Sequence, residues 1–557
     1  MSNLLRKISI TGAFVALALS LGIAAPSNAA EVVAPSNAAV TRLSGADRYL
    51  TSDAIVKSGW STGCATAILA SGLDSNKVDA LTVAPLAKSK NAPVVLVNPK
   101  DSVETIVAKF TALNTKTVYI ANGAAVISTE IEKGLKDAGI TTVIRLGGFD
   151  RYATALNIAK TLSPSNSIVI ANGDNAHLVD SLSIASIAAA KGMPILLASS
   201  SLDTATTAYI NSLEVKTTYV IGGTAVIPDA EVKSLPGVIR LAGAGRYETN
   251  AIVVDTFKSD AALNSNSVFI ASGENASLID ALAGAALAAL KGSPIIFTDG
   301  KDISKIKKSI NTAKYENIVI LGGTAVVSQL SEDLLRGTIT ELDIIESKSL
   351  YNFNMKDNNG QNYIVNIFSD DNQITEASFN PNQDWASVWA GADEGDKLSK
   401  GHYKIAVSKY GETDPDIYDV DNNYEVDKSK ELILNLNREL IRVHENIQAD
   451  QPDFLIMGLP AFTNGSTIEA YYIENGKLKL ANFLENGKTS SFTYTFNSLN
   501  LFFNQKENNI FETSTYDNAE TLGFYIGSWK FDLASGAFTF LNARFMGIDD
   551  YSNYVNR

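Results

Sequence analysis

The sequence predicts three tandem α/β modules, each an open parallel sheet covered by helices, followed by an α+β or mostly β domain. The first observation is a threefold repeat, whose copies start with RLSGADRY at 42–49, RLGGFDRY at 145–152 and RLAGAGRY at 240–247. The second is even spacing, because Pro93, Pro194 and Pro294 lie 101 and 100 residues apart. The third is the alternation of strand-like and helix-like segments within each copy, which favours a parallel sheet.

A processing signal precedes the repeats. Arg6 and Lys7 come before an uncharged apolar stretch at 8–24, and small residues follow it. Three cleavage points are compatible with the sequence, after Ala29, Ala30 or Ala38. We expect residues 1–30 to be a signal peptide and residues 31–40 a linker, in a secreted protein without a transmembrane anchor.

The second copy gives the element order of one module. A β-rich run at 143–146 ends at two glycines, and residues 152–162 have apolar side chains at helical spacing. Three buried or turn-bounded strands are expected next, at 167–171, 195–198 and 218–221. Between the first two, Asp180 is expected to be the N-cap of an Ala-rich helix that ends at Gly192.

The repeat array ends near residue 340, where TITEL replaces the Arg-Leu start of a fourth copy. The predicted domains are three repeats and a C-terminal display or effector domain, at 41–141, 142–237, 238–340 and 341–557. The last of these contains 33 acidic and 17 basic side chains. A domain this acidic is not expected to bind nucleic acid or anionic lipid.

The repeats resemble the cell wall binding repeat 2 family, which occurs in tandem triplets in surface-layer and associated wall proteins of clostridia and other Gram-positive bacteria. The shared landmarks are the RLxGxDRY starts, the Pro-led runs PVVL, PILL and PIIF, the Gly-Gly-Thr-Ala-Val turns, and the aspartates Asp79, Asp180 and Asp280. The resemblance implies three Rossmann-like modules in a pseudo-threefold array at the cell surface. Its implied partner is an anionic cell-wall polysaccharide, bound non-covalently, with surface-layer proteins as further candidate partners.

Two positions depart from the repeat pattern. Copy one has Asn122 where the other copies have Gly222 and Gly322. Copy three has Gly245 in place of the aspartate of the Asp-Arg-Tyr start.

Repeated basic residues are the candidate polymer-binding groups, because guanidinium forks suit phosphate and carboxylate oxygens, and glycine-loop amides can add donors. They are Arg42, Arg145 and Arg240 before the glycine loop, Arg48, Arg151 and Arg246 after it, and Lys191 and Lys291. A structural role is the alternative for the arginines: an adjacent Asp holds the second one, or the arginines lock the modules together. The two lysines are expected to be helix C-terminal charges first and polymer contacts second.

No cofactor or metal is expected. No copy contains G-x-G-x-x-G or G-x-x-x-x-G-K-[ST], which argues against nucleotide binding. An acidic cluster at Asp414, Asp416, Asp419, Asp421 and Glu425 lacks the EF-hand pattern, so we expect a polar loop there instead of a calcium site.

Residues 341–557 are expected to contain a hairpin at 468–483, turning at Asn475-Gly476, and a helix at 428–446. With His402 and His444 as its histidines and no cysteine, this domain excludes cysteine peptidase chemistry and disfavours zinc or Ser-His hydrolysis. We expect a displayed binding module without enzymatic activity, with exposed aromatic side chains as contacts. The alternative is a carboxylate-pair wall hydrolase.

Overall fold

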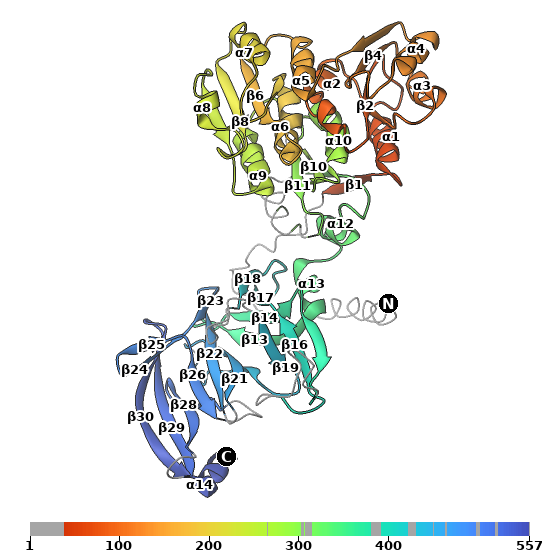
Figure 1. Cartoon of the computed structure of the whole chain (residues 1–557). Helices are drawn as coiled ribbons and strands as arrows, with labels where there is room; N and C mark the ends of the chain where they lie inside the picture. The colour runs from red at the N-terminus through yellow and green to blue at the C-terminus, as the bar shows by residue number, and fades with distance from the viewer. Residues whose placement is uncertain are drawn as a thin grey trace, which may run out of the picture. The chain divides into compact units, whose positions relative to one another are not determined.

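The computed structural model describes residues 38–263, 266–301, 303, 306, 315–379, 392–420, 431–448, 450–462, 465–496, 502–517 and 522–555. The chain divides into two compact units, Pro35–Lys348 and Ser349–Arg557 (Figure 1). The predicted signal peptide, Trp385, Trp389, Asp421 and Glu425 lie outside the described residues. Within them, no helix has both the length and the apolar character needed to cross a bilayer.

Three four-stranded parallel sheets make up the first unit, which confirms the predicted α/β modules. Their strand orders are β3-β2-β4-β5, β7-β6-β8-β9 and β11-β10-β12-β1. The strands are β1 (Ala39–Leu43), β2 (Thr66–Ser71), β3 (Val94–Val97), β4 (Thr117–Ile120), β5 (Thr142–Arg145), β6 (Ser167–Asn172), β7 (Ile195–Ala198), β8 (Thr217–Ile221), β9 (Val238–Leu241), β10 (Ser267–Ser272), β11 (Ile295–Thr298) and β12 (Asn317–Leu321).

Helices cover these sheets. They are α1 (Arg48–Gly59), η1 (Lys77–Ala80), α2 (Ala84–Ser89), α3 (Val103–Ala112), α4 (Thr129–Asp137), α5 (Arg151–Lys160), α6 (Leu178–Lys191), α7 (Thr204–Asn211), α8 (Asp229–Val232), α9 (Arg246–Phe257), α10 (Leu278–Leu290), α12 (Gln329–Arg336) and α13 (Glu341–Lys348). Helix α6 ends as predicted, with Gly192 in the left-handed region at φ 68°.

The first strand of each repeat completes the sheet of the preceding module. Strand β5 pairs in parallel with β4, and β9 pairs in parallel with β8. Strand β1 closes the series, because its residues Ala39–Leu43 pair in parallel with Asn317–Leu321 of β12. The three modules therefore form a closed ring in which the N-terminal strand belongs to the third sheet.

The modules also share one hydrophobic core. Helices α2, α6 and α10 contact one another in all three pairings and lie in the middle of the unit (Figure 1). Their alanine-rich faces are fully buried, and a single core cluster contains side chains from all three repeats. Gly284 lets α10 pack closely on its own sheet, because a Cβ there would lie 2.3 Å from Cδ1 of Leu321 in β12.

The second unit is mostly β, as expected. Its elements are β13 (Ser349–Lys356), β14 (Asn362–Ser369), β15 (Gln373–Glu376), β16 (Lys397–Gly401), β17 (Tyr403–Lys409), β18 (Asp416–Asp419), β19 (Leu432–Asn435), β20 (Ile441–His444), β21 (Phe454–Phe462), β22 (Gly465–Glu474), β23 (Lys477–Leu480), β24 (Asn482–Glu485), β25 (Lys488–Ser490), β26 (Thr493–Phe496), β27 (Asn504–Glu507), β28 (Ile510–Asp517), β29 (Gly523–Asp532), β30 (Ala537–Gly547) and α14 (Ile548–Val555). They form sheets of four, three, five and six strands.

The predicted hairpin is present in β22 and β23. Glu474 pairs with Lys477, and Asn475 and Gly476 have φ of 50° and 79°, as a primed two-residue turn requires. The helix predicted at 428–446 is wrong within the described residues, where β19 and β20 occupy this stretch. The run ELILNLN also alternates with period two, and pairing with β16 and β21 selects the extended form.

Candidate functional site

The first arginine of each repeat ties neighbouring modules together. Arg145 Nη1 donates to the carbonyl of Asn122 at 2.9 Å, and its Nη2 lies 3.0 Å from Glu132. The same arrangement joins Arg42 to Gly322 and Glu332, and Arg240 to Gly222 and Asp229. Each arginine thus fixes the strand that completes the preceding module, which supports the structural alternative for this set.

The glycine loops are closed by internal hydrogen bonds. The amides of Gly45, Gly148 and Gly243 donate to Thr51, Thr154 and Thr249 Oγ1 at 2.9 to 3.0 Å. One amide of each loop is therefore engaged within the chain and is not available to a ligand. The side chains of Asp47 and Asp150 accept from the first turns of α1 and α5, so they cap helices instead of holding the next arginine.

The second arginine of each repeat lies at the carboxyl end of a central strand. Arg151 Nη1 donates to Asn175 Oδ1 at 3.0 Å and to the Gly173 carbonyl. Arg246 Nη1 makes the matching bonds to Asn275, at 3.2 Å, and to Gly273, at 2.8 Å. In copy one, Arg48 keeps the bond to the Gly72 carbonyl, at 2.9 Å, and forms a forked ion pair with Asp74 in place of the bond to asparagine. The neighbouring tyrosine packs on the glycine, since a Cβ at Gly173 would lie 2.8 Å from Tyr152 Cε1.

Each of these arginines interacts electrostatically with an aspartate of the preceding module, which is buried in sites I and III and half-buried in site II. The electrostatic partners are Arg48 and Asp280 (site I), Arg151 and Asp79 (site II), and Arg246 and Asp180 (site III). The ring order is complete, because Arg48 of the first module meets Asp280 of the third. The carboxyl edges of parallel sheets, where ligands commonly bind in open α/β folds, therefore meet as three composite sites.

The prediction that Asp180 is a helix N-cap is wrong, and its counterparts Asp79 and Asp280 do not cap helices either. The N-caps of α6 and α10 are His177 and Ser277, so Asp180 and Asp280 are the third residues of helices that begin earlier. Asp79 lies within the short helix η1. The positions of these carboxyls depend on packing between modules, which cannot be predicted from the sequence pattern of one repeat.

Burial determines the protonation of two of these carboxyls. Asp180 and Asp280 are 7% and 6% exposed, and neither side chain has a hydrogen-bond partner within the described part of the chain. Burial raises the pKa of each to about 6, although Arg246 and Arg48 oppose the shift. Gly222 leaves room for Asp180, because a Cβ there would lie 2.8 Å from Oδ2.

Site II explains the departure in copy one. Asn122 replaces the glycine of the other copies, and its Nδ2 donates to Asp79 Oδ2 at 3.0 Å. Its Oδ1 accepts from the amide of Ser71 at 2.8 Å. The Asp79 carboxyl therefore has a partner in the chain, and burial still raises its pKa.

The two candidate lysines lie apart from the composite sites. Lys191 is the last residue of α6, about 16 Å along the helix from Asp180. It pairs with Asp260 and lies 5.6 Å from the centroid of the Phe257 ring, which joins the second and third modules. Lys291 is the exposed C-cap of α10.

Comparison with known families assigns the repeats. The sequence profile of Cell wall binding domain 2 (CWB2) matches residues 42–132, 145–233 and 240–332. The chain contains three tandem CWB2 domains. Their presence indicates a location at the cell wall.

Two curated proteins of Bacillus subtilis (strain 168) are similar to the chain. N-acetylmuramoyl-L-alanine amidase LytC is 34% identical over 303 residues, which cover 54% of this chain and 58% of that protein. Amidase enhancer is 30% identical over 337 residues, which cover 59% of this chain and 44% of that protein. The chain spans about half the length of these relatives.

Two solved structures from Clostridium difficile also match. Cwp6 is 30% identical with a TM-score of 0.47, covering 53% of this chain and 48% of that one. Cwp8 is 26% identical with a TM-score of 0.46, covering 54% of this chain and 52% of that one.

The buried aspartates are expected to lower the stability of the CWB2 ring at neutral pH. The pKa of Asp180 and of Asp280 is about 6 in the folded chain and near 3.8 in the unfolded chain. The folded state therefore binds the proton more tightly. The stabilisation from protonation is complete below pH 3.8 and is lost as pH rises through 6. D180N/D280N should therefore raise the free energy of unfolding at pH 7.5 by on the order of 2 kcal/mol per site.

Denaturant unfolding from pH 4 to 8 measures this effect. The gain of the double variant over the native chain should grow between pH 4 and 6.5 and then level off. Asp137→Asn, at an exposed ion pair of α4, is the control and should show no such rise. A constant difference across the range would contradict the assignment of the raised pKa to these carboxyls.

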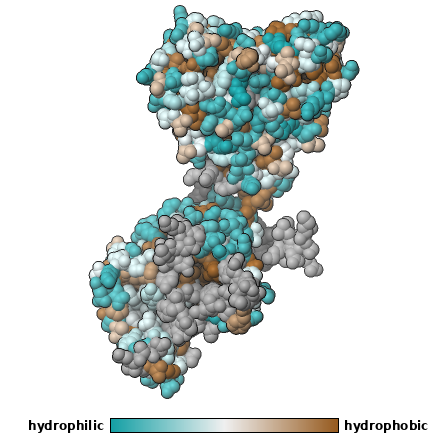
Figure 2. Space-filling model, viewed as in Figure 1, coloured by the Kyte–Doolittle hydropathy of each residue, from teal (hydrophilic) through white to brown (hydrophobic). Residues whose placement is uncertain are grey.

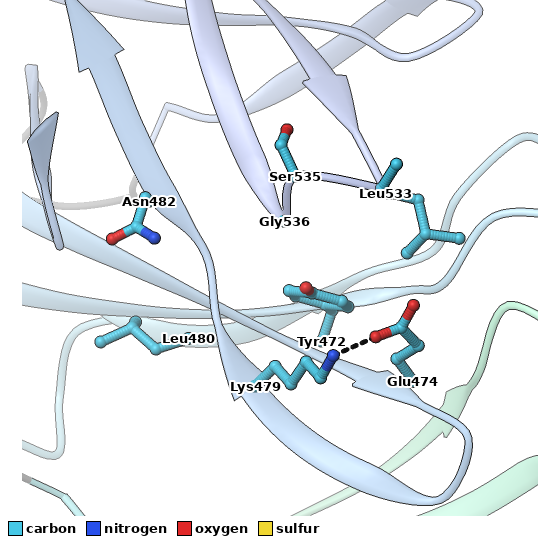
Figure 3. Close-up of a pocket in the computed structure, with 9 residues that line it drawn as sticks. Tyr472, Glu474, Lys479, Leu480, Asn482, Leu533, Ser535 and Gly536 are labelled. Atoms are coloured by element: carbon cyan, nitrogen blue, oxygen red, sulfur yellow. Dashed lines mark hydrogen bonds and ion pairs between the residues drawn. The ribbon is translucent and has the colours of Figure 1, made fainter.

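The second unit contains a polar pocket of about 340 Å³ between the β22–β23 hairpin and the β29–β30 turn (Figure 3). Tyr472 and residues 533–536 line it together with Glu474 and Lys479, which are bonded to each other. Glu474 is the one carboxylate among the described residues that line this pocket. This pocket therefore lacks the carboxylate pair that a glycosidase requires.

The two histidines of this unit make separate contacts. His402 Nδ1 lies 2.7 Å from Asp371 Oδ2, and Ser369 donates to the other oxygen of the same carboxylate. These bonds hold the pKa of Asp371 at about 2. His444 is partly buried beside Gln505, and burial lowers its pKa. Ser369 thus bonds the carboxylate of this His-Asp pair.

Described residues contain no group of three or more His, Cys, Asp or Glu side chains arranged to hold a metal.

Proposed function

We propose that the three CWB2 domains hold the protein non-covalently on an anionic cell-wall polysaccharide, through the composite sites between modules. The observation that carries this proposal is the state of Arg151 and Arg246. Each guanidinium bonds the chain through Nη1 and forms no ion pair with a carboxylate among the described residues. Its other donors remain available for an acidic group of the ligand.

The aspartates supply the complementary chemistry. An ionised carboxylate accepts hydrogen bonds, and Asp180 and Asp280 have no partner among the described residues to satisfy them. A sugar hydroxyl could donate to the carboxylate while a neighbouring phosphate or carboxylate of the polymer binds the arginine. This combination favours a polyhydroxylated polyanion over a simple anion.

Three sites on one ring favour a polymer over a small ligand. Once one repeat of the polymer binds, the next contact is intramolecular, so the combined affinity exceeds that of one site by ~10² to 10⁴. The visible face of the CWB2 unit is mainly hydrophilic, with apolar side chains in scattered patches (Figure 2). That surface suits a hydrated polysaccharide better than an apolar partner.

Binding to purified cell walls should weaken with salt, because screening reduces attraction between arginine and polyanion. We expect the amount of full-length chain that sediments with walls to fall roughly tenfold between 0.05 and 0.5 M NaCl. Walls stripped of their acidic polysaccharide should retain little protein at either salt concentration. Equal sedimentation with stripped and intact walls would reject an anionic polymer as the ligand.

For Ser349–Arg557 we propose display at the cell surface, with the surface layer as its setting. The alternative is an anchored wall hydrolase, which the names of two relatives, an amidase and an amidase enhancer, bring into consideration. Incubating the full chain with purified wall and measuring released reducing sugars and free amino groups separates the two. Release of either product above a heat-denatured control would favour the hydrolase.

A further inference from the structure

We propose that the chain's own Asp74 occupies the arginine of site I, so that sites II and III carry most of the polymer binding and Asp74 limits the overall affinity. This inference rests on the proposed function of the arginines. It states that the three binding sites differ from one another, although the threefold repeat of the sequence suggests that they are equivalent.

The difference lies in the partner of the arginine. Arg48 Nη1 and Nη2 bond the two oxygens of Asp74 at 2.9 and 3.2 Å, which is a forked pair. At the same position of the other copies, Asn175 and Asn275 offer one neutral oxygen to one guanidinium nitrogen. An acidic ligand at site I must therefore displace a carboxylate that already occupies the fork.

A one-residue shift of the acidic side chain produces this difference. In copies two and three, the carboxylates of Asp174 and Glu274 precede the asparagine and accept from the hydroxyls of Tyr152 and Tyr247. In copy one that position is Leu73, and the carboxylate follows it. The tyrosines thus keep the acidic group off the arginine in sites II and III, whereas site I has no such arrangement.

Copy one also adds a cation that is already engaged. Lys77 is 8% exposed, and its ammonium lies 3.4 Å from Asp74 and donates to the Asn275 carbonyl at 2.5 Å. Leu178 and Leu278 occupy its position in the other copies. Site I therefore holds Arg48, Lys77 and Asp74 as one local cluster, in which the carboxylate partly neutralises both cations.

Asp74→Asn tests this proposal in the full chain, because it installs the residue that the other two copies already have. We expect the dissociation constant for purified walls to fall three- to tenfold at 0.15 M NaCl, while the melting temperature stays within a few degrees. Asp137→Asn removes a negative charge from the same module at an exposed ion pair and should leave binding unchanged. In an Arg48→Gln background, Asp74→Asn should bring no gain.

The possible outcomes distinguish failure of this inference from failure of the proposed anchoring function. If the native chain binds walls and Asp74→Asn binds no tighter, the inference is overturned and the anchoring role stands. A gain of equal size from Asp137→Asn, or one that persists in the Arg48→Gln background, also overturns it. If the native chain and its variants all fail to bind, the proposed function itself is wrong.

Discussion

Replacing Arg48, Arg151 and Arg246 together by glutamine is expected to release the protein from isolated cell walls. Glutamine keeps part of the aliphatic stem but removes the charge and the fork that an acidic group would bind. Because the sites act on one polymer, their loss removes the intramolecular gain as well as each contact, and affinity should fall by ~10² to 10⁴. Sedimentation of the full chain with walls measures the loss.

The fold of this triple variant should persist, because the hydrogen bonds of these arginines lie within their own modules. Its thermal unfolding, followed by circular dichroism, should match that of the native chain within a few degrees. The matched control is Arg42, Arg145 and Arg240 replaced by glutamine, which breaks the ties to Glu332, Glu132 and Asp229. The Arg42, Arg145 and Arg240 variant should lose thermal stability. Unchanged wall binding by the Arg48, Arg151 and Arg246 variant would refute the assignment of sites.

Deleting residues 39–43 is expected to open the ring. The deletion removes β1 from the edge of β12 and so leaves β12 unpaired on that side. It also removes Arg42, the ion-pair partner of the buried Glu332. We expect the free energy of unfolding of the CWB2 unit to fall by at least about 3 kcal/mol. Amides of β12 and β10 should exchange with deuterium much faster than in the native chain.

Arg42→Gln is the graded companion to this deletion, because it keeps the strand and removes the tie. It should give a smaller loss of stability with β12 still protected. Size-exclusion chromatography should accompany both variants, since an exposed edge strand can pair with another copy. Unchanged melting and exchange in the deletion variant would show that β1 does not close the ring.

The sequence was informative where structure depends on neighbours along the chain. Glycine at 192, the Asn475-Gly476 turn and the apolar strand at 167–171 each specify a local conformation, and all three are present. Helices α3 and α7 were not anticipated, although Ser102 and Asp203 cap them as expected for such residues.

Pairing between modules could not be predicted from one repeat. The strand at 143–146 has the same apolar character whichever sheet it joins, so its sequence does not show that it completes the preceding module. The composite sites form because the first strand of each repeat joins the sheet of the preceding module. Aspartate suits both the N-cap and the first turn of a helix, so the local sequence does not distinguish the two positions for Asp180. Its packing against Gly222 does.

The most direct test is calorimetric titration of solubilised wall polysaccharide into the full chain and into the Arg48, Arg151 and Arg246 triple variant. Isolated polymer removes every other wall component, and a folded variant removes loss of structure as an explanation. We predict saturable binding by the native chain that weakens with salt, and no measurable heat with the variant. Equal isotherms for the two proteins would contradict anchoring through the arginine sites between modules.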